Sequence, residues 1–324
     1  MAVIDQAMFG IAAAFAFATG ANDGGTLLSI GLKIPGRPRL LAAGVSLTAF
    51  VVLGPLLFGT RVAETFTQSL VTSPAPGSRV ALMLGIVAAV VVVAVLNSLG
   101  LPTSLTLASI GGILGGGLGY GLPISWPAAT HVLLVGLAAP FVGALLGYLG
   151  QRASRLSPPS GSATRAVLRL HQMAFALLCL AYSVNDGQKM LAVLALSGGT
   201  TASAGFVSAT SVLVIGPLFF LGAVFGLPRI AGPLNDGILA MRPNHAVAAQ
   251  FSAGIAVLGS SAIGVPVSMT QALAGGLIGS GVSRGAHRVR WSAVGRIGLA
   301  WVFTLPASFG LAAAAAFLGK VVTS

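Results

Sequence analysis

The chain has 324 residues, a formal net charge of +12, 56% hydrophobic residues and only 7% charged residues. Soluble domains carry about 25% charged residues, so this composition excludes an ordinary water-facing surface and favours a lipid-facing one. Apolar segments recur from end to end with short polar breaks, which predicts one all-α integral membrane domain. The single cysteine excludes a disulfide framework, and the basic residues lie between apolar segments, which argues against nucleic acid as a partner.

Ten segments are long and apolar enough to cross a bilayer, which takes about 20 residues as a helix. The longest could each contain two shorter helices, so we expect ten to twelve transmembrane helices, five or more on each side of a basic connector. In chain order the predicted spans are Met8–Gly31, Leu40–Gly59, Val80–Asn97, Pro102–Gly121, Thr130–Gly150, Leu170–Leu196, Gly205–Leu227, His245–Ser260, Val265–Gly281 and Trp291–Gly319.

The loop cations predict the orientation of these spans. With an outside N-terminus, twelve loop lysines and arginines fall on the cytoplasmic side, whereas Arg61, Arg79 and Lys320 fall outside. This asymmetry follows the positive-inside rule, so we expect a multi-pass protein of the plasma membrane with both termini outside. Residues 151–169 would form a basic cytoplasmic connector between a first unit, residues 1–150, and a second, residues 170–324.

Three sequence motifs occur twice at nearly the same spacing. Asn22 and Asp23 correspond to Asn185 and Asp186, an offset of 163 residues. The motif GPLLFG returns as GPLFFLG at an offset of 162, and GLPTSLT returns as GVPVSMT at an offset of 164. Three matches in one order indicate a duplicated half, and five spans per half make the second half enter the membrane from the opposite side. The sequence therefore predicts two inverted-topology repeats.

Two of the five acidic residues in the chain, Asp23 and Asp186, occupy equivalent positions inside apolar spans. A charge at the bilayer centre costs roughly 2.5–3.5 kcal/mol, so such residues usually serve an ion or a substrate. An Asp186–Lys189 pair that only locks two helices together is the structural alternative. Glycine follows each Asn-Asp pair, and we expect the helix to break there and expose carbonyl oxygens for a small cation. Carboxylates that carry protons instead are an equal alternative.

The Pro-x-Ser-x-Thr segments supply polar groups of another kind. Proline favours the first turn of a helix, so Pro102 and Pro266 are predicted to mark helix N-termini, with the first segment possible as a re-entrant hairpin. A helix N-terminus beside hydroxyls is suited to an anion, and two such ends would fit a tetrahedral oxyanion. Polar contacts that merely hold helices together are the alternative. The groups concerned are Ser104, Thr106, Ser268, Thr270 and Gln271.

These residues resemble a known family. The motifs GANDGGT and VNDGQKM, each followed about eighty residues later by Gly-x-Pro-x-Ser-x-Thr, are similar to the duplicated signature of the inorganic phosphate transporter (PiT) family. The resemblance covers both halves and implies an importer that cotransports phosphate with sodium or protons, while some relatives carry sulfate. The family often has histidine after the last threonine, where this chain has Leu107 and Gln271.

The resemblance also implies roles for single residues. Sodium, if it is the coupling ion, would be held by Asn22, Asp23, Asn185 and Asp186. The resemblance is also the only basis for expecting a homodimer. No organic cofactor is implied. The phosphate site would be lined by Thr103, Ser104, Thr106, Ser268, Thr270 and Gln271, with Gln188 and Lys189 from the second repeat.

The sequence thus predicts a secondary active transporter that imports phosphate by cation symport with alternating access. A sulfate transporter of the same fold and an uncoupled anion channel are the alternatives. An enzyme is disfavoured, because the sequence has no Ser-His-Asp set, metal cluster or nucleotide-binding loop.

Overall fold

The computed structural model describes residues 2–33, 40–71, 77–99, 101, 103–154, 163–200, 209–231 and 237–323. The described part of the chain is helical almost throughout, and its single β pairing is an isolated antiparallel bridge between Val71 and Ile124. The prediction of an all-α protein is therefore confirmed at this level.

The first half contains nine helical elements, two of them π-helical turns (η). They are α1 (Ala2–Thr19), η1 (Gly20–Gly24), α2 (Gly25–Gly31), α3 (Leu40–Phe58), α4 (Arg61–Glu64), η2 (Thr65–Ser69), α5 (Ser78–Ser98), α6 (Leu105–Tyr120) and α7 (Trp126–Ala153) among the described residues. The described second half contains α8 (Ala163–Tyr182), the π-helical turn η3 (Ser183–Gly187), α9 (Gln188–Ser197), α10 (Ala209–Ala231), α11 (Pro243–Ala262), α12 (Met269–Val282), the 3-10 turn η5 (Ala286–Arg288) and α13 (Trp291–Thr323).

Five continuous helical stretches are long and apolar enough to cross a membrane. They are Ile4–Gly31, Ser78–Ser98, Trp126–Ala153, Arg165–Ser197 and Trp291–Val321. Three further apolar helices, within α3, α6 and α10, are shorter. The chain is therefore a membrane protein by helix length and composition, whereas the number of spans stays a prediction.

The outer face of α7 shows why water is the wrong solvent for this surface. Leu134, Leu137, Phe141 and Leu145 are each at least 60% exposed and recur at helical spacing. A contiguous apolar stripe of this kind would be unfavourable in water and is what a helix presents to lipid tails. The opposite face of α7 carries the small residues Gly143 and Gly147, which let the backbone of α12 approach closely.

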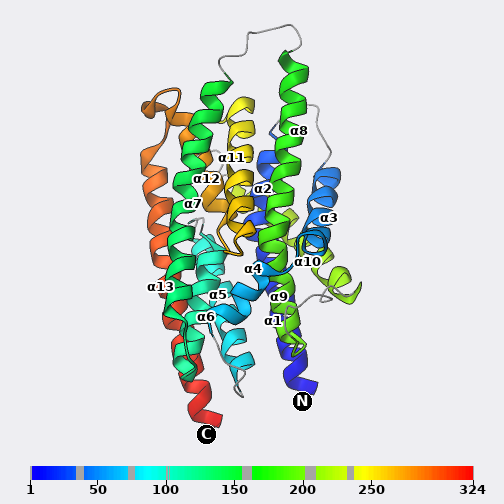
Figure 1. The fold of residues 1–324 in the computed structure, drawn as a ribbon, viewed down its shortest axis with the longest axis vertical. Helices are drawn as coiled ribbons and strands as arrows, with labels where there is room; N and C mark the ends of the chain where they lie inside the picture. The colour runs from blue at the N-terminus through cyan, green and yellow to red at the C-terminus, as the bar shows by residue number, and fades with distance from the viewer. Residues whose placement is uncertain are drawn as a thin grey trace.

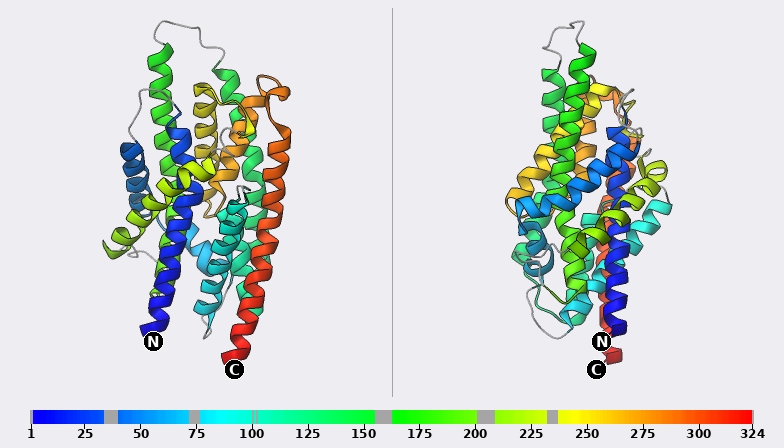
Figure 2. Two further views of the ribbon diagram at one scale, coloured as in Figure 1. Left: turned by 180° about the vertical axis from the view of Figure 1, so that it is seen from behind. Right: turned by 90° about the vertical axis from the view of Figure 1, so that its right-hand side faces the viewer.

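Matching elements of the two halves run in opposite directions. Figure 1 shows α1 and α2 rising from the N-terminus, whereas α8 and α9 descend from the other end. Likewise α7 rises and α13 descends, so both chain termini lie at one end of the molecule (Figures 1 and 2). The α5–α6 pair occupies one half of the height and the α11–α12 pair the other half. Neither pair extends along the full height of the molecule, and re-entrant hairpins would be short in the same way.

The two halves pack against each other in a reciprocal pattern. Helix α6 packs against α13, and its counterpart α12 packs against α7. In the same way α10 packs against η1, and α3 packs against η3. The two halves are therefore interlocked rather than placed side by side.

Candidate functional site

Both Asn-Asp pairs lie on π-helical turns inside otherwise continuous helices. The first pair is in η1, between α1 and α2, and the second is in η3, between α8 and α9. In η1 the backbone N–H of Gly25 donates to the carbonyl of Gly20, five residues back. An extra residue in one turn redirects the side chains around it, and such turns are frequent at functional sites.

The expected helix break at the glycines is wrong, because the backbone stays helical through both turns. Gly25 and Gly187 instead permit close packing. A β-carbon on Gly25 would lie 2.7 Å from the backbone of Gly226 in α10, and one on Gly187 would lie 2.6 Å from the carbonyl oxygen of Val51 in α3. The glycines therefore let a helix of the opposite half contact each π-helical turn.

Serine, not proline, begins the two helices of the Pro-x-Ser-x-Thr segments. Ser104 is the N-cap of α6 and accepts from the N–H of Leu107 at 3.1 Å, and Ser268 is the N-cap of α12 and accepts from Gln271 at 3.4 Å. A serine at this position satisfies a backbone donor that the helix itself cannot. Pro266 lies two residues before its cap, so the predicted proline-started helix is wrong there, and Pro102 lies outside the described residues.

The same hydrogen bond joins a π-helical turn to a helix start in each half. The Asn22 amide donates to the Thr103 carbonyl at 3.3 Å, and the Asn185 amide donates to the Val267 carbonyl at 2.6 Å. Each accepting carbonyl belongs to the residue just before a capping serine. The Asn-Asp pairs and the helix starts, which lie about eighty residues apart in the sequence, are therefore brought together in both halves.

A second set of contacts crosses between the halves. Lys189 forms an ion pair with Asp186 at 2.5 Å and donates to the Thr106 hydroxyl at 2.6 Å. The Val267 carbonyl accepts from Lys189, from Thr106 and from Asn185.

All twelve residues predicted for the site are buried in the structure. Three of the twelve are charged, and these are also buried: Asp23 and Asp186 are each 3% exposed and Lys189 is 2% exposed. Buried charges need partners, so this amount of polarity inside an apolar bundle indicates a functional centre. The other buried members are Asn22, Thr103, Ser104, Thr106, Asn185, Gln188, Ser268, Thr270 and Gln271.

Several buried acceptor oxygens of the centre have no hydrogen-bond donor among the described residues. They include Oδ1 of Asn97, Oδ1 of Asn185, Oδ2 of Asp186 and Oε1 of Gln271. Amide and carboxylate oxygens are the ligands that hard cations such as sodium or calcium prefer. The chemistry of these oxygens therefore suits a small cation. No cluster of three or more His, Cys, Asp or Glu side chains suited to a metal ion occurs in the described chain.

Two side chains of the centre were not among the predicted residues. Asn97, at the end of α5, donates to Oδ1 of Asn22 at 3.1 Å, and Thr304 of α13 bonds the hydroxyl of Thr103. Asn97 could have been predicted from the sequence, because its amide side chain lies in an otherwise apolar run. Thr304 lies in the middle of an apolar helix with no motif around it, so nothing in the sequence indicated its partner.

Gln188 has a contact that differs from its predicted role. Its amide oxygen accepts from the backbone N–H groups of Val62 at 2.9 Å and Ala63 at 3.2 Å, at the start of α4. A contribution to an anion site stays a prediction for this residue.

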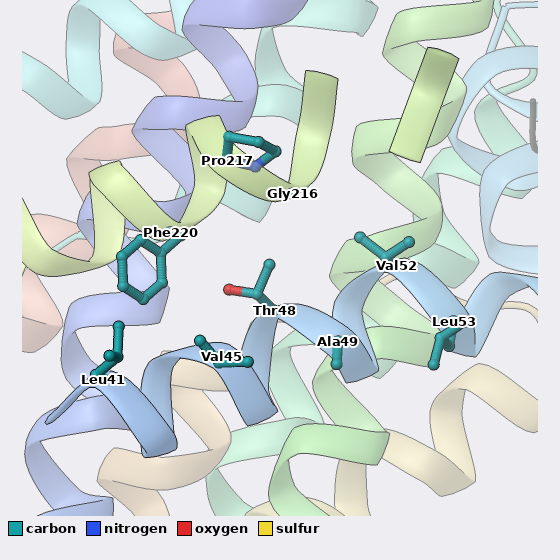
Figure 3. Close-up of a pocket in the computed structure, with 9 residues that line it drawn as sticks. All are labelled: Leu41, Val45, Thr48, Ala49, Val52, Leu53, Gly216, Pro217 and Phe220. Carbon is teal, nitrogen blue, oxygen red and sulfur yellow. The ribbon is translucent and has the colours of Figure 1, made fainter. Parts of the chain in front are cut away.

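A cavity lies beside α3 and is lined by none of the twelve predicted residues. It has a volume of about 530 Å³ between α3 and α10, and Thr48 is the one polar side chain among its nine lining residues, which include Val45, Pro217 and Phe220 (Figure 3). The cavity offers no charged group to an ion. The polar centre at the Asn-Asp turns is therefore the candidate site.

The family comparison covers most of the chain, from residue 39 to residue 312. The model of the "Phosphate transporter family" matches residues 39–157 and 151–312. The chain belongs to the phosphate transporter family. Members of this family are transporters, so the protein is a membrane transporter and not an enzyme.

Similar proteins of the phosphate transporter family span most of the chain. A probable low-affinity inorganic phosphate transporter of Rhizobium meliloti is 28% identical over 313 residues, which cover 93% of this chain and 91% of the relative. A protein of Mycobacterium tuberculosis strain H37Rv described in the same words is 31% identical over 316 residues, which cover 91% of this chain and 72% of the relative.

One solved structure shares the fold of this family member. The structure described as "The sodium-dependent phosphate transporter" matches with a TM-score of 0.80 and 18% sequence identity, and it covers 99% of this chain and 100% of that chain. A match of this extent shows that the helices share one architecture.

Proposed function

We propose that the protein imports inorganic phosphate together with a cation, by alternating access around the buried polar centre. The observation that carries this proposal is the joining of each Asn-Asp turn to a capped helix start, by the Asn22–Thr103 and Asn185–Val267 hydrogen bonds. Family membership and the names of the relatives support phosphate as the substrate.

The two helix starts supply the anion half of the site. The first N–H groups of α6 and α12 have no partner within their own helices, and the helix dipole favours negative charge at this end. Thr106 and Thr270 lie two residues after the capping serines and add hydroxyl groups to these helix starts. A tetrahedral oxyanion is matched by donors of this kind converging from two helices.

The Asn-Asp turns supply the cation half. Asp23 accepts from the Asn22 amide at 2.8 Å, which leaves carboxylate and amide oxygens for an ion. A bound cation offsets the charge of the anion across a dry site, so each ligand raises the affinity for the other. Sodium is the favoured cation, because the structural neighbour is described as sodium-dependent.

Alternating access follows from an inverted relation between the halves. The antiparallel course of matching helices in Figure 1 and the reciprocal packing of α6 on α13 and α12 on α7 support such a relation. Rocking of one repeat against the other would open the central site to one side at a time. The outside location of both termini and the plasma membrane remain predictions.

Radiolabelled phosphate uptake into proteoliposomes tests the proposal. We expect accumulation of phosphate above the outside concentration when an inward sodium gradient is imposed, and little accumulation with a proton gradient alone. Accumulation driven only by protons would replace sodium with the proton. Uptake that never exceeds equilibrium would favour a channel, and stronger competition by sulfate than by unlabelled phosphate would favour a sulfate transporter.

A further inference from the structure

The two Asn-Asp turns differ in what neutralises their carboxylates. In the second half the Lys189 ammonium is the partner of Asp186, with 2.5 Å between Nζ and Oδ1. An ammonium group has three N–H donors, and three acceptors surround this one. They are the Asp186 carboxylate, the Thr106 hydroxyl at 2.6 Å and the Val267 carbonyl at 3.3 Å.

The oxygens around Lys189 are those that would surround a bound cation. A carboxylate, a hydroxyl and a backbone carbonyl are all hard ligands of the kind that alkali and alkaline-earth ions take. Lys189 reaches them because it follows Asp186 by three residues, on the same face of the helix. The ammonium therefore lies where a free ion bound to the second turn would lie.

The first half has no such built-in charge. At the offset of 163 residues that relates Asp23 to Asp186, Lys189 corresponds to Thr26. The Thr26 hydroxyl donates to the carbonyl of Asn22 at 3.1 Å. Within the described part of the chain Asp23 forms no ion pair, whereas Asn97 turns an amide toward its neighbour Asn22.

We propose that Lys189 is a tethered cation that fills the cation site of the second half, so that only the first half exchanges a cation with water. Each transport cycle then carries one mobile cation fewer than two equivalent Asn-Asp sites would carry. This inference rests on the proposed function and adds its stoichiometry. It also places Lys189 between the cation site and the anion site, because Lys189 donates to Thr106, which belongs to the anion half.

Counting the mobile cations on purified protein tests the inference independently of transport. Equilibrium binding of radiolabelled sodium, with proton uptake followed by an indicator in the same sample, counts ions whichever species couples. We expect one mobile cation on the wild type, none on Asp23→Asn, and two on Lys189→Thr, which copies Thr26. Lys33→Thr removes a lysine beyond the end of α2 and is the matched control, with the wild-type count.

A charge-neutral double variant protects the test from misfolding of Lys189→Thr. Asp186→Asn combined with Lys189→Met removes the ion pair as a unit, and we expect it to keep the wild-type count. Loss of one cation in this double variant, or two mobile cations on the wild type, would overturn the inference. A folded Lys189→Thr protein that binds no more mobile cations than the wild type would also overturn it.

The two proposals fail in different ways. If the wild type shows the expected counts but takes up no phosphate, the transport function is wrong and the tethered cation stands. If phosphate accumulates but Asp23→Asn still binds a mobile cation, the tethered cation is wrong and the transport function stands.

Discussion

The turn around Asp23 and the turn around Asp186 have the same backbone but different chemistry. Each is a buried π-helical turn whose asparagine donates to the carbonyl before a capping serine. The two turns differ at two positions. Thr26 stands at the position that corresponds to Lys189, and Ser261 stands at the position that corresponds to Asn97, at an offset of 164 residues. A duplicated scaffold has thus kept its geometry while its two sites have become unequal.

The shorter side chain in the second half has a visible effect. Asn97 donates to Oδ1 of Asn22, whereas the hydroxyl of Ser261 and Oδ1 of Asn185 are both buried without a hydrogen-bond partner in the part of the chain that the structure describes. The first turn therefore has an amide that orients its asparagine, and the second has a lysine that neutralises its aspartate.

Asp23→Asn should give the largest effect on transport. It removes the carboxylate that holds the mobile cation, so we expect phosphate accumulation in proteoliposomes to fall on the order of 100-fold, about 2.7 kcal/mol. The protein should be made and should unfold at the wild-type temperature, because no buried cation loses an ion-pair partner. Asp5→Asn is the control, since Asp5 is half exposed and pairs with Arg79 on the surface.

Asp186→Asn should show the opposite profile, with stability affected most. Lys189 would remain buried without its carboxylate, and breaking a buried ion pair costs about 3–5 kcal/mol. We expect a clearly lower midpoint in thermal unfolding of the purified protein, and recovery of most of the loss in Asp186→Asn combined with Lys189→Met. Equal stability of Asp23→Asn and Asp186→Asn would remove the difference drawn between the halves.

Asn97→Ala should weaken the first site without abolishing it. Partners that orient ion ligands typically contribute about 10-fold to 100-fold in metal affinity, and we expect the low end for a single amide. The measurement is the cation concentration that gives half-maximal phosphate uptake. Ser261→Ala is the matched change in the second half and should leave that concentration unaltered.

Removing the capping serines should have the smallest and most symmetrical effect. Loss of an N-cap side chain costs about 1 kcal/mol, and Ser104 and Ser268 make the same bond. We therefore expect Ser104→Ala and Ser268→Ala to lower the thermal midpoint by similar amounts. A several-fold difference between them would mean that one serine has a further role.

The sequence predicted the polar centre because its residues are conspicuous in apolar surroundings. Asp23 and Asp186 stand out among few acids, and their repetition at one offset indicated that they act together. All-helical architecture followed from composition for a similar reason, since long apolar runs have few alternatives in lipid. Family membership agreed with the motifs that carried the resemblance.

What the sequence did not predict depends on contacts between distant segments. The glycines after each Asn-Asp pair indicated a helix break, because glycine is equally suited to a break and to close packing, and only the approach of α3 and α10 decides between them. The helix starts at Ser104 and Ser268 were missed for a related reason, since proline and serine are both favoured near a helix N-terminus. Thr304 could be found only by knowing that α13 passes the start of α6.

The interlocking of the halves has a consequence for how the protein can be built. The first π-helical turn is covered by α10 of the second half, and the second turn is covered by α3 of the first half. Neither half can therefore bury its own aspartate in isolation. If residues 1–154 and 163–324 were made as two separate polypeptides, each would persist in the membrane only when the other was synthesised with it.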